Sequence, residues 1–305
     1  MRALLLWCAQ NEWLSQHVPS WGFVQRAVKR FMPGDDFDAA LAAAVAFKAQ
    51  NIGAVFTKLG ENIKSMAEAA AAVEHYETVL TSAAGAGIEP EISIKPTQVG
   101  LDIDPDATFN NLSRLAAAAA KVKGFMWIDM EGSAYTDRTL DLYNRIHARH
   151  PATGVCLQAY LYRTAADVYR MLPFKPAIRL VKGAYAEPAD RAFPAKRDVD
   201  ANYLALCALM LPDVNRGRLK LVVATHDVPL IERTARFADA IGMDRHHLEV
   251  HMLYGIQSAQ QMRLAKEGYR VKHLISYGDA WYAWYLRRLA ERPANVLFVA
   301  RQMFG

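Results

Sequence analysis

The amino-acid sequence predicts an α/β fold, a (β/α)8 barrel of the TIM type with extra helices at its N-terminus. Short apolar or β-branched runs recur eight times along the chain, and segments with helical patterns separate them. Alternating strands and helices favour a parallel sheet, and eight repeats favour closure of that sheet into a barrel. A chain of 305 residues is long enough to fold as one such barrel.

The expected strands are the runs in which apolar and β-branched residues are most concentrated. They are Gly53–Thr57, Glu91–Lys95, Phe125–Asp129, Val155–Ala159, Ile178–Val181, Leu219–Ala224, Leu248–Met252 and Val271–Ser276. We expect residues 51–305 to form the barrel as a single catalytic domain. Residues 1–50 have a helical pattern throughout and are expected to form an N-terminal arm or cap.

Capping residues, prolines and glycines mark the ends of the helices between these strands. Asp104 followed by Pro105 combines an N-cap with a first-turn proline, and that helix is expected to end at Gly124. Gly85 and Gly87 end the preceding Ala-rich helix. Asp227 and Pro229 mark the start of a later helix. Asp279 marks the start of the last helix, and Pro293 marks its end.

An open, doubly wound sheet is the alternative architecture. It would place a glycine-rich nucleotide-binding loop directly after a strand. The segment Gly85-Ala86-Gly87 lacks the third glycine of that motif and follows a helix. We therefore interpret it as a helix end.

Bulk composition excludes several classes of protein. No apolar run reaches the ~18 residues that span a bilayer, and the short N-terminal run MRALLLW has no small-residue cleavage site after it, so we expect a cytoplasmic protein. Three cysteines, far apart, predict neither a disulfide framework nor a zinc site. The net charge of +5 suits an anionic ligand or a membrane surface. The chain has no run of basic residues interleaved with aromatic residues, so the sequence gives no indication of nucleic-acid binding.

The segment AIRLVKGAYAEP, residues 177–188, is the most informative stretch of the chain. A short apolar strand ends at Lys182-Gly183-Ala184-Tyr185, where the small residues allow the backbone to approach a ligand closely. Arg179 interrupts the strand, and a buried arginine requires an anionic or dipolar partner. The structural alternative is an ordinary strand end with a solvated lysine and a core tyrosine.

Polar side chains follow most of the predicted strands, at the end where a barrel carries its chemistry. Taken singly, each has an ordinary explanation as a solvated charge, a turn cap or a satisfied core residue. No HxH or HExxH spacing predicts a metal site. The set is Lys58, Lys95, Asp129, Glu131, Gln158, Tyr160, Lys182, Tyr185, Thr225, His226, Asp227, Tyr254 and Tyr277.

The last predicted helix carries a second group of charges. Trp284, Arg287, Arg288 and Glu291 recur at helical spacing and share one face. A solvated face with an ordinary Arg287–Glu291 ion pair is the structural alternative. Two adjacent arginines among aromatic residues favour the binding of a carboxylate.

Several motifs together resemble the flavin-dependent proline dehydrogenases in their short, monofunctional bacterial form. They are SIKPTQVGLDID (93–104), WIDMEG (127–132), CLQAYLYR (156–163), IRLVKGAYAEP (178–188), VVATHD (222–227), EVHMLYG (249–255) and YLRRLAERPANV (285–296). They follow the family order, and RLVKGAY together with the RRLAE helix is highly specific. The resemblance implies a distorted (βα)8 barrel, in agreement with the strand pattern.

The resemblance also implies a reaction and its site. Non-covalent FAD would accept a hydride at N5 from ring C5 of L-proline, giving 1-pyrroline-5-carboxylate, and a membrane quinone would reoxidise it. Asp129 and Arg179 are implied as catalytic residues. The implied cofactor residues are Met130, Gln158, Arg179, Val181, Lys182, Gly183, Ala184, Thr225 and His226. The implied substrate residues are Lys95, Tyr185, Leu253, Leu274, Trp284, Arg287, Arg288 and Glu291.

Two positions depart from the family pattern, because Leu274 and Trp284 stand where tyrosines are usual. Both changes remove a hydroxyl beside the substrate ring, so a modified or ring-substituted proline is an alternative substrate. A cofactor-free lyase that forms a Schiff base on Lys182 or Lys95 is a second alternative. A barrel that only binds a ligand or partner is a third.

Overall fold

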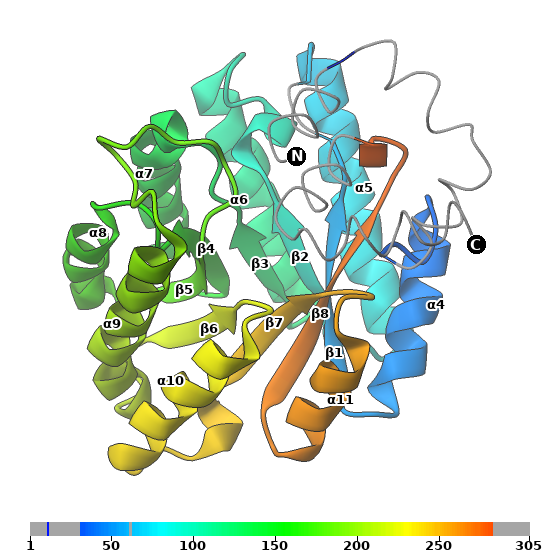
Figure 1. Cartoon of the computed structure of the whole chain (residues 1–305). Helices are drawn as coiled ribbons and strands as arrows, with labels where there is room; N and C mark the ends of the chain where they lie inside the picture. The colour runs from blue at the N-terminus through cyan, green and yellow to red at the C-terminus, as the bar shows by residue number, and fades with distance from the viewer. Residues whose placement is uncertain (1–10, 12–30, 61–62, 283–305) are drawn as a thin grey trace.

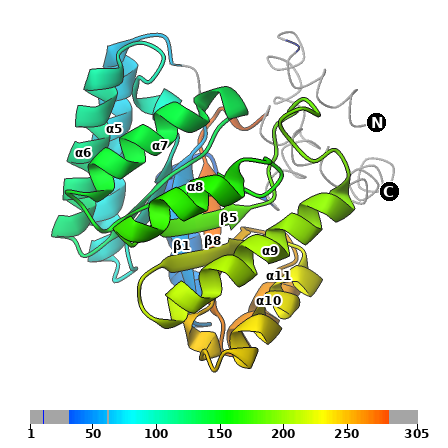
Figure 2. The same cartoon turned by 90° about the vertical axis from the view of Figure 1, so that its left-hand side faces the viewer.

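The structure is a computed structural model that describes residues 11, 31–60 and 63–282. Within these residues, eight parallel strands close into a barrel in sequence order, and helices surround it (Figures 1 and 2). The strands are β1 Ile52–Lys58, β2 Glu91–Ile94, β3 Phe125–Ile128, β4 Thr153–Gln158, β5 Ala177–Val181, β6 Lys220–Ala224, β7 Glu249–Leu253 and β8 Arg270–Tyr277. All eight predicted strands are confirmed, with small shifts at their ends.

Helices cover the outer face of the barrel. The α-helices are α4 Phe37–Lys48, α5 Met66–Gly85, α6 Pro105–Lys121, α7 Thr136–His147, α8 Thr164–Met171, α9 Lys196–Asn215, α10 Val228–Ala240 and α11 Ser258–Lys266. Short 3-10 turns are η2 Pro96–Val99, η3 Ser133–Tyr135, η4 Leu172–Phe174 and η5 Arg245–His247. None of the helices described is both long and apolar enough to cross a membrane.

Pairing between the first and last strands closes the barrel. β1 and β8 run parallel over the whole of β1, from Ile52 beside Val271 to Lys58 beside Tyr277. An open sheet has two edge strands, whereas each of these eight strands pairs with two neighbours, so the doubly wound alternative is excluded. The predicted TIM-type barrel is confirmed.

Helix α4 belongs to the segment that was expected to form an N-terminal arm. It packs on β1 and β8, and Ala40 and Ala44 are buried against the barrel core. The expectation that residues 1–50 are helical throughout is wrong for residues 31–36, which form turns and bends. Pro33 and Gly34 disfavour a helix there, and Asp36 caps α4 by accepting a 2.8 Å hydrogen bond from the Ala39 amide.

The predicted helix-end signals are confirmed at α5 and α6. At α10 the predicted N-cap residue, Asp227, bonds lysine side chains instead. Asp104 caps α6 by accepting hydrogen bonds from the amides of Asp106 and Ala107 at 3.0 and 2.9 Å. Gly87 has a φ of +69° at the end of α5. Asp227 precedes α10 and forms no side-chain cap there.

Alternate residues of each strand face the barrel interior, as strand pleating requires. Lys272 of β8 contacts Glu91 of β2, two strands away, which is only achievable through the interior. Strand registers extend this alternation around the barrel. The inward positions are Gly53, Val55, Thr57, Glu91, Ser93, Lys95, Phe125, Trp127, Asp129, Gly154, Cys156, Gln158, Ala177, Arg179, Val181, Lys220, Val222, Ala224, Glu249, His251, Leu253, Lys272, Leu274 and Ser276.

Candidate active site

The carboxyl ends of the parallel strands bring most of the predicted site residues to one mouth of the barrel. Lys95 follows β2 and Asp129 follows β3, while Gln158, Val181 and Leu253 are the last residues of their strands. All five occupy inward positions. Residues that are far apart in sequence therefore share one rim of the barrel because the strands are parallel and the barrel is closed.

Arg179 is the centre of this group, and its guanidinium is buried, with 3% of the side chain exposed. It forms an ion pair with Asp129. Ser93 lies between them: its Oγ accepts a 2.7 Å hydrogen bond from Arg179 Nη2 and donates a 2.9 Å hydrogen bond to Asp129 Oδ1. The anionic partner that the sequence required for Arg179 is therefore Asp129.

The surroundings of Arg179 keep it charged. Burial by itself disfavours the guanidinium, but the carboxylate of Asp129 holds the pKa of Arg179 above its ordinary value. The guanidinium carbon lies 5.2 Å from the centre of the Trp127 ring, a cation–π contact. Arg179 is thus a fixed positive charge at the mouth of the barrel.

Two buried polar atoms beside this pair have no hydrogen-bond partner among the residues that the structure describes. They are Nη1 of Arg179, a donor, and Oε1 of Gln158, an acceptor. The two residues belong to neighbouring strands, β5 and β4. Buried polar groups in proteins are normally hydrogen-bonded, so these atoms suit a ligand with both acceptor and donor groups.

The backbone after β5 passes close to the Tyr160 ring, and a glycine at position 183 makes this possible. Gly183 has a φ of +113°, and a Cβ at this position would lie 2.4 Å from the Tyr160 ring. No other residue type fits without displacing Tyr160 or the backbone. The segment Lys182–Ala184 therefore passes directly over Tyr160 and stays half-buried at the barrel mouth.

Lys182 has two carboxylate partners. Its Nζ lies 2.5 Å from Asp200 Oδ1 and 2.7 Å from Asp227 Oδ2. Lys196 also pairs with both aspartates. Burial favours the protonated acid, but the hydrogen bonds and charges of Lys182 and Lys196 hold the pKa of Asp227 below its ordinary value. These contacts fix the start of α9 against the end of β6.

The VVATHD segment closes the next part of the rim. Thr225 Oγ1 accepts a 3.1 Å hydrogen bond from the Asp227 amide. The amide of Leu253 donates a 3.1 Å hydrogen bond to Nε2 of His226. A neutral His226 with this acceptor nitrogen carries its proton on Nδ1.

Leu253 and Leu274 form an apolar wall on the opposite side of the mouth. They are direct register partners on β7 and β8, and both are half-buried. Leu274 packs on the small interior cluster of Val55, Trp127, Ala177 and Val222. Tyr185 is half-buried and Met130 is buried at the same end of the barrel.

Comparisons with known proteins agree with this architecture. Residues 40–301 match the family model described as proline dehydrogenase. The chain belongs to the proline dehydrogenase family. Proline dehydrogenase 1 of Bacillus subtilis subsp. natto is 34% identical over 99% of this chain and 98% of its own. Proline dehydrogenase of Deinococcus radiodurans is 38% identical over 90% of this chain and 89% of its own. The expected oxidoreductase class is confirmed.

Solved structures share the proline dehydrogenase family barrel. Proline utilization A from Bdellovibrio bacteriovorus superposes with a TM-score of 0.83 and 21% identity. Proline utilization A from Corynebacterium freiburgense superposes with a TM-score of 0.76 and 21% identity. This chain covers 36% and 34% of those longer proteins, so the likeness shows the fold of one part of them.

Four of the substrate residues implied by the family resemblance lie outside the described residues. They are Trp284, Arg287, Arg288 and Glu291. The carboxylate-binding role of that last predicted helix therefore stays a prediction, as do the individual roles of the other site residues. The site residues that the structure does describe lie together at the carboxyl end of the barrel.

Several residues that contact the candidate site residues were missed by the sequence argument. Ser93 bridges Arg179 and Asp129, and Asp200 and Lys196 complete the network of Lys182. Strand alternation gives a signal for Ser93, because it lies two residues before Lys95 and so on the same inward face. No such signal exists for the residues of α9, which approach β5 only in the folded chain.

Proposed function

We propose that this chain oxidises L-proline to 1-pyrroline-5-carboxylate with non-covalently bound FAD. The observation that carries the proposal is the largely buried Arg179–Asp129 pair beside a donor and an acceptor atom that have no partner among the described residues, at the mouth of a proline dehydrogenase family barrel. The curated relatives match this chain over most of their length, and they are named proline dehydrogenases.

The residues at the mouth fit a flavin. Arg179 Nη1 offers a buried donor and Gln158 Oε1 a buried acceptor for a polar heterocycle. The backbone at Gly183 packs against Tyr160 too closely for a Cβ, which holds this segment at the barrel mouth where the cofactor would bind. Once bound, FAD would supply the hydride acceptor for ring C5 of proline. The full proposed set is Met130, Gln158, Arg179, Val181, Lys182, Gly183, Ala184, Thr225 and His226.

The chain's own part is electrostatic and positional. Arg179 places a fixed positive charge where the cofactor gains electrons, and Asp129 holds that charge in place. Lys95, together with Arg287 and Arg288, would bind the substrate carboxylate. Cationic groups in a site that excludes water also disfavour the ammonium form of the substrate, which must lose its proton for the hydride to leave.

The apolar wall would hold the substrate ring. Leu253 and Leu274 lie side by side there, and Tyr185 lies in the first part of the loop that follows β5. Trp284 and Glu291 are proposed to complete the pocket from the last predicted helix. Hydrocarbon on this side suits an unsubstituted ring, whereas a hydroxylated ring would lose hydrogen bonds to water without regaining them.

The contacts of Lys182 disfavour a Schiff-base lyase. Two carboxylates at 2.5 and 2.7 Å engage its Nζ, so this atom is held within the protein instead of being presented to a carbonyl substrate. A lyase also gives no role to the Arg179–Asp129 pair. The network is instead suited to holding the loop that follows β5.

A membrane quinone is the proposed electron acceptor. A cytoplasmic protein that docks reversibly on the inner membrane could reach it, and the net charge of +5 favours an anionic lipid surface. Reduction of a soluble quinone analogue by proline, followed with and without anionic vesicles, tests both parts of this proposal.

Visible absorbance of the purified protein tests the main proposal. A yellow protein whose flavin bands bleach anaerobically with L-proline is the expected result, and Arg179→Met should bleach more slowly at equal flavin content. Arg288→Ala should raise the KM for proline while flavin stays bound, because the proposal places it at the substrate carboxylate. A colourless protein that cannot be reconstituted with FAD would contradict the proposal.

A further inference from the structure

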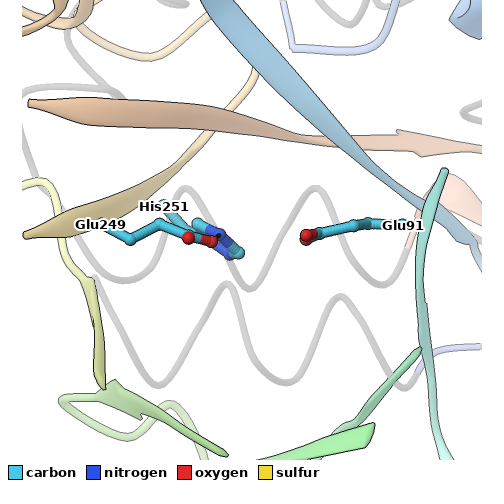
Figure 3. Close-up of side chains that lie close together, drawn as sticks. All are labelled: Glu91, Glu249 and His251. Atoms are coloured by element: carbon cyan, nitrogen blue, oxygen red, sulfur yellow. Dashed lines mark hydrogen bonds and ion pairs between the residues drawn. The ribbon is translucent and has the colours of Figure 1, made fainter. Parts of the chain in front are cut away.

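A group of charged side chains lies inside the amino end of the barrel, below the mouth. We call it the floor cluster and define it as Glu91, Lys220, Glu249, His251 and Lys272. Figure 3 shows Glu91 approaching Glu249 and His251 from the opposite wall of the barrel. Ligand atoms of these three lie within 4.8 Å of one another. Strand alternation puts Glu249 and His251 on the same inward face of β7, but only the folded barrel brings Glu91 of β2 to them.

Lysine ammonium groups balance the carboxylates of the floor cluster. Lys272 Nζ lies 2.6 Å from Glu91 and 3.9 Å from Glu249, and Lys220 Nζ lies 3.2 Å from Glu249. Burial disfavours the charged amine, yet the two carboxylates raise the pKa of Lys272 above its ordinary value. His251 Nε2 lies 2.8 Å from Glu249, and burial lowers the pKa of His251. The cluster is therefore an ion network in which lysine ammonium groups lie against the carboxylates.

Trp127 connects the floor cluster to the active site. Its indole Nε1–H donates a 3.1 Å hydrogen bond to Glu91 Oε2, and the Arg179 guanidinium lies over its ring at 5.2 Å. The indole is fully buried. A Cβ on Gly154 would lie 2.4 Å from the ring, so a glycine is required opposite it. The centres of the Trp127 and His251 rings lie 5.7 Å apart in a T-shaped arrangement.

These contacts determine where the guanidinium of Arg179 lies. Ser93 and Asp129 fix one of its nitrogens, Nη2, in the guanidinium plane. Contacts at one nitrogen do not by themselves fix the rest of the guanidinium, and the indole ring, 5.2 Å from the guanidinium carbon, adds a second contact. The hydrogen bond to Glu91 in turn fixes the indole. Nη1 is then held in one place for a ligand.

We propose that Glu91, acting through Trp127, is a positioning residue for the guanidinium of Arg179. This inference rests on the proposed flavin site. It assigns the floor cluster a part in catalysis at a distance: Lys272 holds the Glu91 side chain in place, Glu91 orients the indole, and the indole orients the cation that faces the cofactor.

The variants Trp127→Phe and Glu91→Gln test the proposal, with Glu89→Gln as the matched control. Glu89 also contacts Lys272, at 2.8 Å, but it lies half-exposed and is not bonded to the indole. We expect Trp127→Phe to slow flavin reduction by proline about fivefold, the size of one lost hydrogen bond. The flavin midpoint potential, measured by reductive titration without proline, should fall in the same variant. Glu91→Gln should shift both in the same direction, and Glu89→Gln neither.

A double variant separates positioning from general destabilisation. In an Arg179→Met background, Trp127→Phe should leave the midpoint potential unchanged, because its effect passes through the guanidinium. An equal additional fall in that background overturns the inference, as does a normal potential in Trp127→Phe itself.

Crystal structures of the flavin-free wild type and Trp127→Phe give a readout that needs no cofactor. The inference requires a displaced or disordered guanidinium in the variant, and an unmoved one contradicts it. Failure of the wild type to bind FAD would contradict the proposed function alone, since this structural comparison still decides the positioning role.

Discussion

Asp129 and Arg179 form a buried ion pair across the barrel mouth, although they are fifty positions apart and β4 runs between their strands. Ser93 hydrogen-bonds to both. Removing one partner of such a pair leaves an uncompensated buried charge. The pair therefore has a structural role, and the catalytic role proposed for it needs a separate measurement.

Arg179→Met should retain the fold but lower the midpoint potential of bound flavin, because a nearby cation stabilises the reduced form more than the oxidised form. Loss of a buried partner also leaves Asp129 unneutralised, so stability should fall by about 3 kcal/mol. Reductive titration and urea unfolding measure the two effects. An unchanged potential with full activity would mean that Arg179 serves structure alone.

Ser93→Ala should perturb the pair without removing either charge. We expect a loss of about 1–2 kcal/mol of stability and a several-fold slower flavin reduction, because one bridging hydroxyl is lost. Ser93→Thr keeps the hydroxyl and is the matched control. Stopped-flow reduction by proline compares them, and equal rates for Ala and Thr would remove Ser93 from the site.

Gly183→Ala should weaken FAD binding. The added Cβ meets Tyr160 at 2.4 Å, and the φ of +113° disfavours any side chain. Gly217→Ala is the control, because Gly217 also has a positive φ, +66°, but its Cβ would meet nothing within 4 Å. Titration of the apoproteins with FAD should give a raised Kd only for Gly183→Ala. A similar Kd for both would show that the loop does not contact the cofactor.

Leu274→Tyr should change the preference among ring-substituted prolines. A 4-hydroxyl against the Leu253–Leu274 wall loses water without gaining a partner, which costs about 1–3 kcal/mol. Trans-4-hydroxyproline should therefore be a poor substrate of the wild type and a better one of the variant. The values to compare are kcat/KM for proline, 4-hydroxyproline and an apolar 4-substituted proline. Three unchanged ratios would place Leu274 away from the substrate ring.

His273 should weaken the fold at acid pH. Its ring is buried between Phe47 and Tyr254, and neither ring nitrogen has a partner among the described residues. Burial lowers the pKa of His273 from 6.5 to about 4. The unfolded chain therefore binds a proton first, and stability present above pH 6.5 is lost as the pH falls toward 4. The difference corresponds to about 3 kcal/mol.

His273→Phe should flatten that acid limb, because a phenyl ring keeps the packing and does not titrate. Urea unfolding at pH 7 and pH 4.5 measures the change, with the exposed His247→Phe as control. Buried His251 has a lowered pKa as well and should supply a remaining slope. An acid limb as steep as that of the wild type would refute the assignment to His273.

The sequence by itself determined the barrel, its strands and most of the described rim. These features depend on local patterns: strand periodicity, caps such as Asp104, and the rule that parallel strands carry their polar ends on one face. Lys95, Asp129, Gln158 and Arg179 could be named because each lies at or near a strand end. The demand that Arg179 have an anionic partner also came from local chemistry.

Only the tertiary structure decided which of these residues touch. Strand registers and the closure between β1 and β8 set the partners of Arg179, the pairing of Leu253 with Leu274, and the two carboxylates around Lys182. The floor cluster joins β2, β6, β7 and β8 through the interior. Such contacts depend on distances across a closed barrel. A linear pattern fixes which face a side chain occupies but not what it meets there.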